Sequence, residues 1–227
     1  MATPSKRIGS RRYKLTQGVM EGCLATRRAR PLAWYVAGRR VRVGDRMQRG
    51  YTYTLVFDAG KSLRHGGWRD DGEVVRYDGF RPRYSPRQML RMGVFEGKYC
   101  NDKIFEFPRE WYLTAAGRFN AEKFSPEAAD PGANFFGVKS RQSLGEWRRR
   151  SWVPCHPSDR DMRGWFEWYC RYWLGRRQPS VDAIQVARWM AFVRHYAQFK
   201  TQTEGRGEST HPRRRQALLQ WSYPCRG

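Results

Sequence analysis

Four carboxylates lie within or beside the most aromatic stretch of the chain and are the side chains best suited to catalysis. Residues 164–177 contain six aromatic side chains and three arginines, and Asp159, Asp161, Glu167 and Asp182 surround or interrupt them. Carboxylates that converge can hold Mg²⁺ and activate water against a phosphodiester bond. These four residues are therefore the candidate catalytic groups of an enzyme acting on nucleic acid. Asp182 is also explained by its expected place in the first turn of a helix, where an acid stabilises the helix dipole.

Nine arginines offer a second kind of chemistry, the binding of phosphate. A guanidinium group presents paired donors to phosphate oxygens and can stack on a base. The arginines form three groups at the expected ends of helices, where phosphates are commonly bound. The candidate nucleic-acid-binding residues are Arg148, Arg149, Arg150, Arg171, Arg176, Arg177, Arg213, Arg214 and Arg215. A solvated charged face is the alternative interpretation of these groups.

Cysteine and histidine give little support for other chemistry. Cys155 and His156 are neighbours in the sequence, but adjacent side chains diverge, so we do not expect a nucleophile and its base there. The cysteines lack a CxxC pair and the histidines lack the spacing of metal ligands. We expect neither a disulfide framework nor a cofactor, and Mg²⁺ only if the enzymatic alternative holds.

The formal net charge of +23 is the strongest functional statement of the composition. So positive a protein usually has a polyanionic partner, because neutralising phosphates releases condensed counterions. We expect DNA or RNA as the partner, with further protein partners in a nucleoprotein assembly. No apolar run approaches the roughly 18 residues of a membrane span, and no secretory signal follows the basic N-terminus. The expected location is intracellular, in the nucleus or an organelle.

Composition divides the chain into three parts. Residues 1–32 are basic and nearly free of acids, which predicts a disordered arm. Such an arm can be a binding tail, a nuclear localisation signal or an organellar transit peptide. Residues 33–80 alternate short β-type segments with Gly and Asp turns, which predicts a small antiparallel β subdomain. Residues 81–223 have a helical period and predict a mainly helical domain with a mobile loop near residues 114–135. The expected strands are residues 34–36, 41–43, 51–57 and 73–77.

Capping residues locate the helices of the third part. Helices are expected at residues 86–92, 144–150, 161–174, 180–200 and 212–221. Ser85 before a proline is typical of a helix start, and Gly93 of its end. Ser180 is the expected N-cap of a later helix, and Gly175 should end the aromatic one. The tryptophans and tyrosines of that helix recur at i, i+3 and i+4, which predicts a buried stripe with Arg171 on its basic edge. An exposed ring that stacks on a base is the alternative.

Several blocks of the third part have a specific order and spacing. They are residues 80–99, 106–111, 137–139, 142–144, GWFEWYCRYWLGRR at 164–177 and RQALLQW at 215–221. These blocks resemble a family of uncharacterised proteins found in large DNA viruses of eukaryotes and in plants, algae and protists. The resemblance covers residues 80–223 and implies a domain boundary but no activity. Glu96 stands where members often have a second glycine, and Arg141 where a cysteine is common, so we do not expect a catalytic thiol there.

Together these features predict an α+β protein, in which a small antiparallel β subdomain precedes a mainly α-helical domain. The expected function is sequence-nonspecific binding of DNA or RNA through arginine contacts to phosphate, in DNA maintenance or in a ribonucleoprotein. One alternative is an enzyme that uses the carboxylates to act on nucleic acid. Another is an adaptor that binds an acidic protein.

Overall fold

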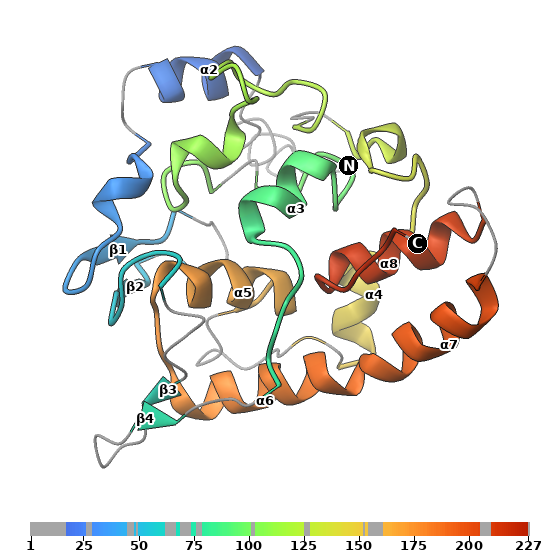
Figure 1. Ribbon diagram of the computed structural model, residues 1–227. Helices are drawn as coiled ribbons and strands as arrows, with labels where there is room; N and C mark the ends of the chain where they lie inside the picture. The colour runs from blue at the N-terminus through green and yellow to red at the C-terminus, as the bar shows by residue number, and fades with distance from the viewer. Residues whose placement is uncertain are drawn as a thin grey trace, which may run out of the picture.

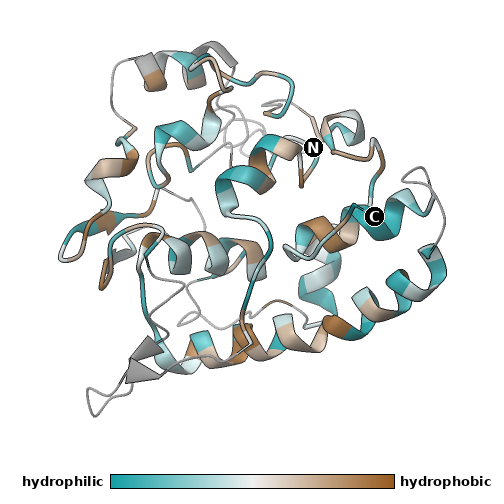
Figure 2. Cartoon of the chain, viewed as in Figure 1, coloured by the Kyte–Doolittle hydropathy of each residue, from teal (hydrophilic) through white to brown (hydrophobic). Residues whose placement is uncertain are grey.

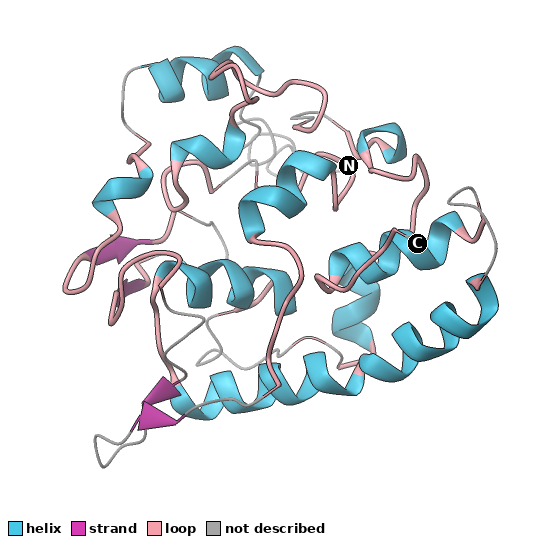
Figure 3. Ribbon diagram, in the orientation of Figure 1, coloured by secondary structure: helices cyan, strands magenta, loops and turns pink. Residues whose placement is uncertain are grey.

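The protein is α+β: a two-stranded antiparallel sheet near the N-terminus precedes a mostly helical region (Figures 1 and 3). The predicted fold class is therefore confirmed. The computed structural model describes residues 17–25, 29–44, 48, 50–61, 67–68, 74–75, 79–100, 103–124, 128–151, 153, 161–204 and 210–226.

The described helices and strands are short. The α-helices are α2 (Gln17–Ala25), α3 (Pro86–Met92), α4 (Leu144–Arg149), α5 (Trp165–Leu174), α6 (Pro179–Ala191), α7 (Val193–Thr203) and α8 (Pro212–Gln220). The 3-10 helices are η1 (Leu32–Trp34), η4 (Arg109–Tyr112) and η5 (Pro131–Ala133). The strands are β1 (Arg40–Arg42), β2 (Thr52–Thr54), β3 (Gly67–Trp68) and β4 (Val74–Val75). β1 pairs with β2 and β3 with β4, both antiparallel, and Val41 lies opposite Tyr53. None of the described helices has the length and apolar composition needed to cross a bilayer.

Helix α5 lies at the centre of the molecule and is buried on nearly every side (Figure 1). Gly175 ends it in the left-handed conformation, with φ of 112°, as the sequence predicts. A Cβ atom at this position would lie 1.9 Å from the carbonyl oxygen of Phe57, so only glycine fits. The amides of Val56 and Phe57 both donate to the carbonyl oxygen of Gly175, at 2.8 and 3.2 Å. The chain that leaves β2 is thereby attached to the end of α5.

The start and end of α3 follow the predicted capping residues. The Ser85 hydroxyl accepts from the amide of Gln88, the Gln88 side chain accepts from the amide of Ser85, and Pro86 opens the helix. Gly93 ends α3 with φ of 89°. A Cβ atom on Gly93 would lie 1.9 Å from the carbonyl oxygen of Ala133, so this helix end depends on contact with a distant segment.

The expected disordered arm is partly ordered. Residues 17–25 form α2, in which Met20, Cys23 and Leu24 are buried, so the prediction is wrong for this segment. Tertiary packing explains this helix, because its buried apolar side chains join the hydrophobic core. Residues 1–16 and 26–28 of the expected arm lie outside the described residues.

One further expectation is corrected within residues 31–36, and the structure describes part of the loop expected at residues 114–135. The segment around Trp34 is the 3-10 helix η1 instead of a strand. In the expected loop at residues 114–135 most described residues are exposed, but Asn120, Phe124, Ala133 and Asn134 are buried. Phe124 and Asn134 are each 2% exposed, and Lys123 donates its ammonium to the carbonyl oxygen of Ala133 at 3.1 Å. Burial of these side chains compensates for the low helical and strand propensity of the segment.

The predicted helix at residues 180–200 is divided into α6 and α7 at Phe192. Ser180 lies inside α6 and is exposed, and the N-cap is Gln178, with Pro179 as the first helical residue. The ring of Phe192 stacks on Trp221 after α8, with centroids 5.0 Å apart and planes 14° apart. This tertiary contact lies at the division between the two helices, where local sequence has neither glycine nor proline.

One hydrophobic core joins most of the described helices to the β1–β2 pair. It contains side chains from α2, from the β1–β2 pair and from α3, α5, α6, α7 and α8. Val41 and Tyr53, which face each other across the β1–β2 pair, belong to the same cluster as Trp168 of α5. The small sheet therefore covers one side of α5 and determines what surrounds the polar residues of this helix.

Candidate nucleic-acid interface

The polar side of α5 is buried in an ion-pair network. Arg171 is fully buried, with Nε 2.6 Å from Glu106 Oε1 and Nη1 3.0 Å from Asp161 Oδ1. Nη2 of Arg176 lies 2.5 Å from the second oxygen of Asp161. Among the described residues, the network holds three carboxylates and three cations, whose formal charges cancel: Glu106, Asp161, Glu167, Lys103, Arg171 and Arg176. Such balance is what allows charges to remain ionised in a low-dielectric interior.

Glu167 occupies the part of this network nearest Lys103. It pairs with the Lys103 ammonium, and both of its oxygens lie 3.1 Å from Nε2 of Gln48. The amide of Arg163 also donates to it at 2.9 Å. Burial alone would raise the pKa of Glu167, but the positive charges of Arg171 and Lys103 outweigh burial and lower the pKa to about 2. Glu167 is therefore an ionised structural partner at neutral pH.

Asp182 is also buried, near the start of α6. Its Oδ1 accepts from the indole nitrogen of Trp168 at 2.7 Å, and its Oδ2 accepts from the amide of Gln178 at 2.9 Å. Burial raises the pKa of Asp182, although both hydrogen bonds oppose the rise. Asp182 therefore lies in the first turn of α6, where the sequence predicted an acid that stabilises the helix dipole, and it also satisfies a buried tryptophan.

The candidate catalytic carboxylates do not share an open site. Asp161, Glu167 and Asp182 are each 0% exposed and already accept from protein donors. Asp159, Cys155 and His156 lie outside the described residues. Within the described part of the chain, His, Cys, Asp and Glu side chains form no group of three or more that could hold a metal ion.

Four of the nine candidate arginines are inside the protein, which corrects the expectation that they form an exposed basic edge. Arg171, Arg176 and Arg215 are almost completely buried, and Arg177 is 8% exposed. Arg177 donates to the carbonyl oxygens of Tyr172 and Arg176, and its guanidinium lies 3.6 Å from the centroid of the Tyr172 ring. Arg215 donates to the carbonyl oxygens of two residues near the C-terminus of the chain, Thr210 and Cys225. These arginines hold backbone segments together.

The other five candidate arginines are at the surface. Arg149, Arg150, Arg213 and Arg214 are exposed, and Arg148 is half-buried. Arg150 and Arg149 pair with Glu146 on α4 and lower the pKa of this carboxyl. Figure 2 shows α8 hydrophilic at its N-terminal end, where Arg213 and Arg214 lie, and more hydrophobic toward its C-terminal end.

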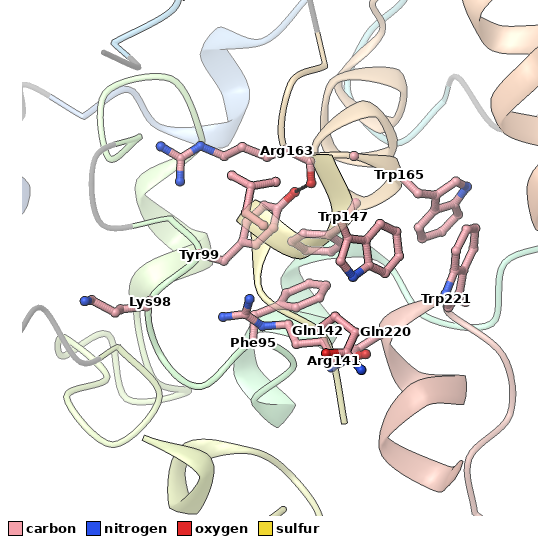
Figure 4. Close-up of a pocket in the computed structure, with 13 residues that line it drawn as sticks. Phe95, Lys98, Tyr99, Arg141, Gln142, Trp147, Arg163, Trp165, Gln220 and Trp221 are labelled. Atoms are coloured by element: carbon pink, nitrogen blue, oxygen red, sulfur yellow. Dashed lines mark hydrogen bonds between the residues drawn. The ribbon is translucent and has the colours of Figure 1, made fainter. Parts of the chain in front are cut away.

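A cavity of about 250 Å³ lies between α4, the start of α5, the end of α8 and the turn after α3 (Figure 4). We call it the aromatic cavity, because six aromatic side chains form most of its wall: Phe95, Tyr99, Trp147, Trp165, Phe166 and Trp221. Two amides, from Gln142 and Gln220, and three basic side chains, from Lys98, Arg141 and Arg163, complete it. Figure 4 shows the Trp147 indole extending between Tyr99 and the Trp165–Trp221 pair.

Positive backbone dihedrals position the wall of the aromatic cavity. Glu96 and Gly97 have φ of 56° and 73°, which turns the chain sharply and places Phe95 and Tyr99 side by side, with ring centroids 4.6 Å apart. Gly164, with φ of 89°, directs the chain into Trp165, the first residue of α5. The Tyr99 hydroxyl donates to the carbonyl oxygen of Arg163 at 2.9 Å, which fastens the turn to α5 (Figure 4).

Stacked rings hold the opposite wall. Trp165 stacks on Tyr169, with centroids 4.9 Å apart, and lies 5.2 Å from Trp221. Trp221 in turn stacks on Phe192. A column of four aromatic rings, formed by Tyr169, Trp165, Trp221 and Phe192, therefore supports this wall of the cavity and holds Trp165 and Trp221 in place.

Arg141 is a cation at the cavity whose hydrogen-bonding capacity is incompletely used. Its Nη2 lies 3.5 Å from Oε2 of Glu96, and its guanidinium lies 6.0 Å from the centroid of the Phe95 ring. Its Nε is buried without a hydrogen-bond partner in the described part of the chain. A guanidinium held in this way retains donors for a phosphate or carboxylate oxygen.

A second hollow of about 680 Å³ continues from the aromatic cavity across α6, α7 and α8. It shares Arg141, Gln142, Trp147, Gln220 and Trp221 with the cavity, and it adds Arg188, Arg194 and His195. We call it the basic depression. The Ser140 hydroxyl at its edge donates to the carbonyl oxygen of Arg213 at 2.7 Å, so the N-terminal end of α8 borders it.

The two hollows together form a basic surface with aromatic walls. Among the described residues that line them, five are lysine or arginine and none is aspartate or glutamate. Sequence reasoning identified the neighbouring Arg148–150 and Arg213–214 but missed Lys98, Arg141, Arg163, Arg188 and Arg194, which come from five separate segments. Trp147 carried the only local signal, because an aromatic side chain directly precedes three arginines.

In comparisons with known proteins, no family model, no curated protein and no solved structure matches this chain.

Proposed function

We propose that this protein binds nucleic acid through phosphate contacts along the basic depression and the adjoining end of α8. The observation that carries the proposal is the composition of this surface, which gathers lysine and arginine from five segments and no acid among its described lining residues. The net charge of +23 supports it, since a cation-lined hollow on so basic a protein attracts polyanions over long range.

Solvent access distinguishes the arginines that can contact a phosphate from those that stabilise the fold. The buried Arg171 and Arg176 are neutralised by carboxylates and hold the fold together. Exposed Arg213 and the partly exposed Arg141 are placed where a phosphate can reach them. Phosphate contacts of this kind determine affinity and position, and they carry little sequence information. The binding is therefore nonspecific in sequence.

The other two candidate functions have less support. An enzymatic function would require carboxylates that reach a substrate. The three described candidate carboxylates, Asp161, Glu167 and Asp182, are completely buried. The adaptor requires a partner with carboxylates in place of phosphates. A guanidinium binds both, so the adaptor becomes an outcome of the binding experiment.

The test is a titration by fluorescence anisotropy of labelled DNA and RNA strands across a range of salt concentrations. We expect the logarithm of the association constant to fall linearly with the logarithm of the salt concentration. The double variant Arg213→Glu and Arg214→Glu should reduce the magnitude of the slope by about 1.4 on single strands and about 1.8 on a duplex, if each arginine contacts one phosphate.

The control is a double variant with the same change in charge, Arg40→Glu and Arg42→Glu. These residues are exposed on β1, on the opposite side of the molecule from α8 (Figure 1). Its slope should stay close to that of the wild type. Equal losses in both variants would show that net charge, and not this surface, determines binding. Equal affinity for polyglutamate and nucleic acid would replace the proposal with the adaptor.

A further inference from the structure

We infer that the aromatic cavity receives one unpaired base, so that single-stranded nucleic acid is the preferred substrate class. This inference rests on the proposed function, because the phosphates of the same strand would lie along the basic depression. It adds a claim that phosphate binding does not require: the bases are contacted as well as the backbone.

The dimensions and lining of the cavity fit a flat, partly polar ring. Its volume of about 250 Å³ lies just below the roughly 300–1,000 Å³ of sites for drug-sized ligands. Aromatic faces from Trp147, Trp165 and Tyr99 form its sides. Stacking between a base and an aromatic side chain tolerates any base, because every base has a π-face.

Polar groups of the lining can satisfy the edge of a base. The Gln142 side chain is exposed, so its amide can donate to and accept from a ligand. Gln220 is nearly buried, and its Nε2 donates to the carbonyl oxygen of Val94 at 3.1 Å, which holds its amide in place beside the cavity. An entirely apolar lining would favour a lipid or a hydrophobic side chain; these amides favour a heterocycle.

The charges of the lining residues also favour a nucleotide over an uncharged heterocycle. Side chains of Lys98, Arg141 and Arg163 line the cavity, and no acid is present among the described lining residues. Figure 4 shows the charged ends of Lys98 and Arg163 directed outward on the Tyr99 side, away from Trp165 and Trp221. A strand with one base in the cavity would carry phosphates on both sides of that base. Arg141 lines both hollows, so it stands where the backbone would pass from the cavity to the basic depression.

A duplex is a poorer ligand for the cavity than a single strand, because the cavity needs an unpaired, accessible base. Its bases are stacked and paired, and extruding one costs a few kcal/mol. A single strand offers its bases at much lower cost. The cavity therefore converts a general attraction for polyanions into a preference for unpaired strands.

The test compares three probes of equal length: an oligothymidylate, the same strand with abasic sites in place of its bases, and a duplex. Wild-type protein should bind the oligothymidylate most tightly. Trp147→Ala should weaken this binding by roughly 5- to 150-fold, the effect of losing one stacked base. It should leave the abasic strand, the duplex and all salt slopes nearly unchanged, because the phosphate contacts remain.

Trp34→Ala is the matched control. Trp34 is a half-buried tryptophan in η1, on the other side of the molecule (Figure 1), and its loss should change none of the three affinities. Equal weakening of all probes by Trp147→Ala would overturn the inference, and so would equal binding of normal and abasic strands. In both cases a salt-dependent affinity would leave the proposed function standing, whereas the loss of salt-dependent binding to every probe would refute both.

A second measurement needs no variant and so does not depend on the folding of Trp147→Ala. A strand containing 4-thiothymidine is photo-crosslinked to wild-type protein, and the attached peptides are mapped. Crosslinks in the peptides that carry Trp147 or Tyr99 are the expected result. Crosslinks confined to other surfaces would exclude the aromatic cavity as the site of the base.

Discussion

Glu167 should contribute more to stability than any exposed carboxylate of this protein. The substitution Glu167→Gln removes its negative charge but keeps its size, and it leaves Lys103 and Arg171 with one carboxylate fewer. Breaking a buried ion pair from one side costs about 3–5 kcal/mol, because the remaining charge is uncompensated. The lowered pKa leads to a similar figure. A change from 4.5 to about 2 corresponds to about 3 kcal/mol, at about 1.4 kcal/mol for each tenfold change in proton affinity.

Urea denaturation followed by tryptophan fluorescence and far-ultraviolet circular dichroism measures this difference. At neutral pH we expect the free energy of unfolding to fall by about 3 kcal/mol, and the melting temperature by about 6–12 °C. Glu146→Gln is the control, because Glu146 pairs with Arg149 and Arg150 at the surface of α4. Exposed pairs contribute about 0–1 kcal/mol. Variants of Glu167 and Glu146 with equal stability would refute the reasoning.

The pH dependence of the free energy of unfolding tests independently whether the charge of Glu167 causes its contribution to stability. The pKa of Glu167 is depressed in the folded protein, so its ionisation stabilises the fold fully above about pH 4.5 and less as the pH falls toward 2. The difference between wild type and Glu167→Gln should therefore be constant near neutral pH and fall to about half by pH 3. A difference that does not change with pH would mean that packing, and not charge, is responsible.

Two further substitutions probe close approaches and buried hydrogen bonds. Gly93→Ala should lower the free energy of unfolding by about 2 kcal/mol or more, because its Cβ would meet the carbonyl oxygen of Ala133. Gly137→Ala, where φ is 63° and the surrounding space is open, should lower it by about 1 kcal/mol. Similar chemical-denaturation midpoints for the two variants would contradict this prediction. Asp182→Ala leaves the indole nitrogen of Trp168 without its acceptor, so we expect a loss of about 1–3 kcal/mol in thermal or urea unfolding, and an unchanged melting temperature would show that the indole finds another partner.

Local signals in the sequence predicted both ends of α3 and the C-terminal end of α5, but not the start of α6. Ser85 and Gly93 delimit α3, and Gly175 ends α5, because capping depends on hydrogen bonds and dihedral angles within a few residues. The division of residues 180–200 at Phe192 was not predictable in this way. The residue lies where its ring stacks on Trp221, which is distant in the sequence.

The same distinction separates the two groups of arginines. Arg171 and Arg149 look alike in sequence, since each lies near the end of a helix in a basic stretch. The structure buries Arg171, because Glu106 and Asp161 come from other segments to neutralise it. Burial of an arginine depends on partners that periodicity does not reveal.

The sequence by itself determined the fold class, the caps of α3, the glycine that ends α5 and the strong positive charge, because each follows from composition or from neighbours along the chain. Tertiary structure decided which charges reach solvent, and it brought Trp147, Trp165 and Trp221 together from three separate segments into the aromatic cavity. The fourteen residues at 164–177 illustrate both contributions. Their aromatic stripe is a local property, whereas the burial of the polar side of α5 results from the sheet and loops that cover it.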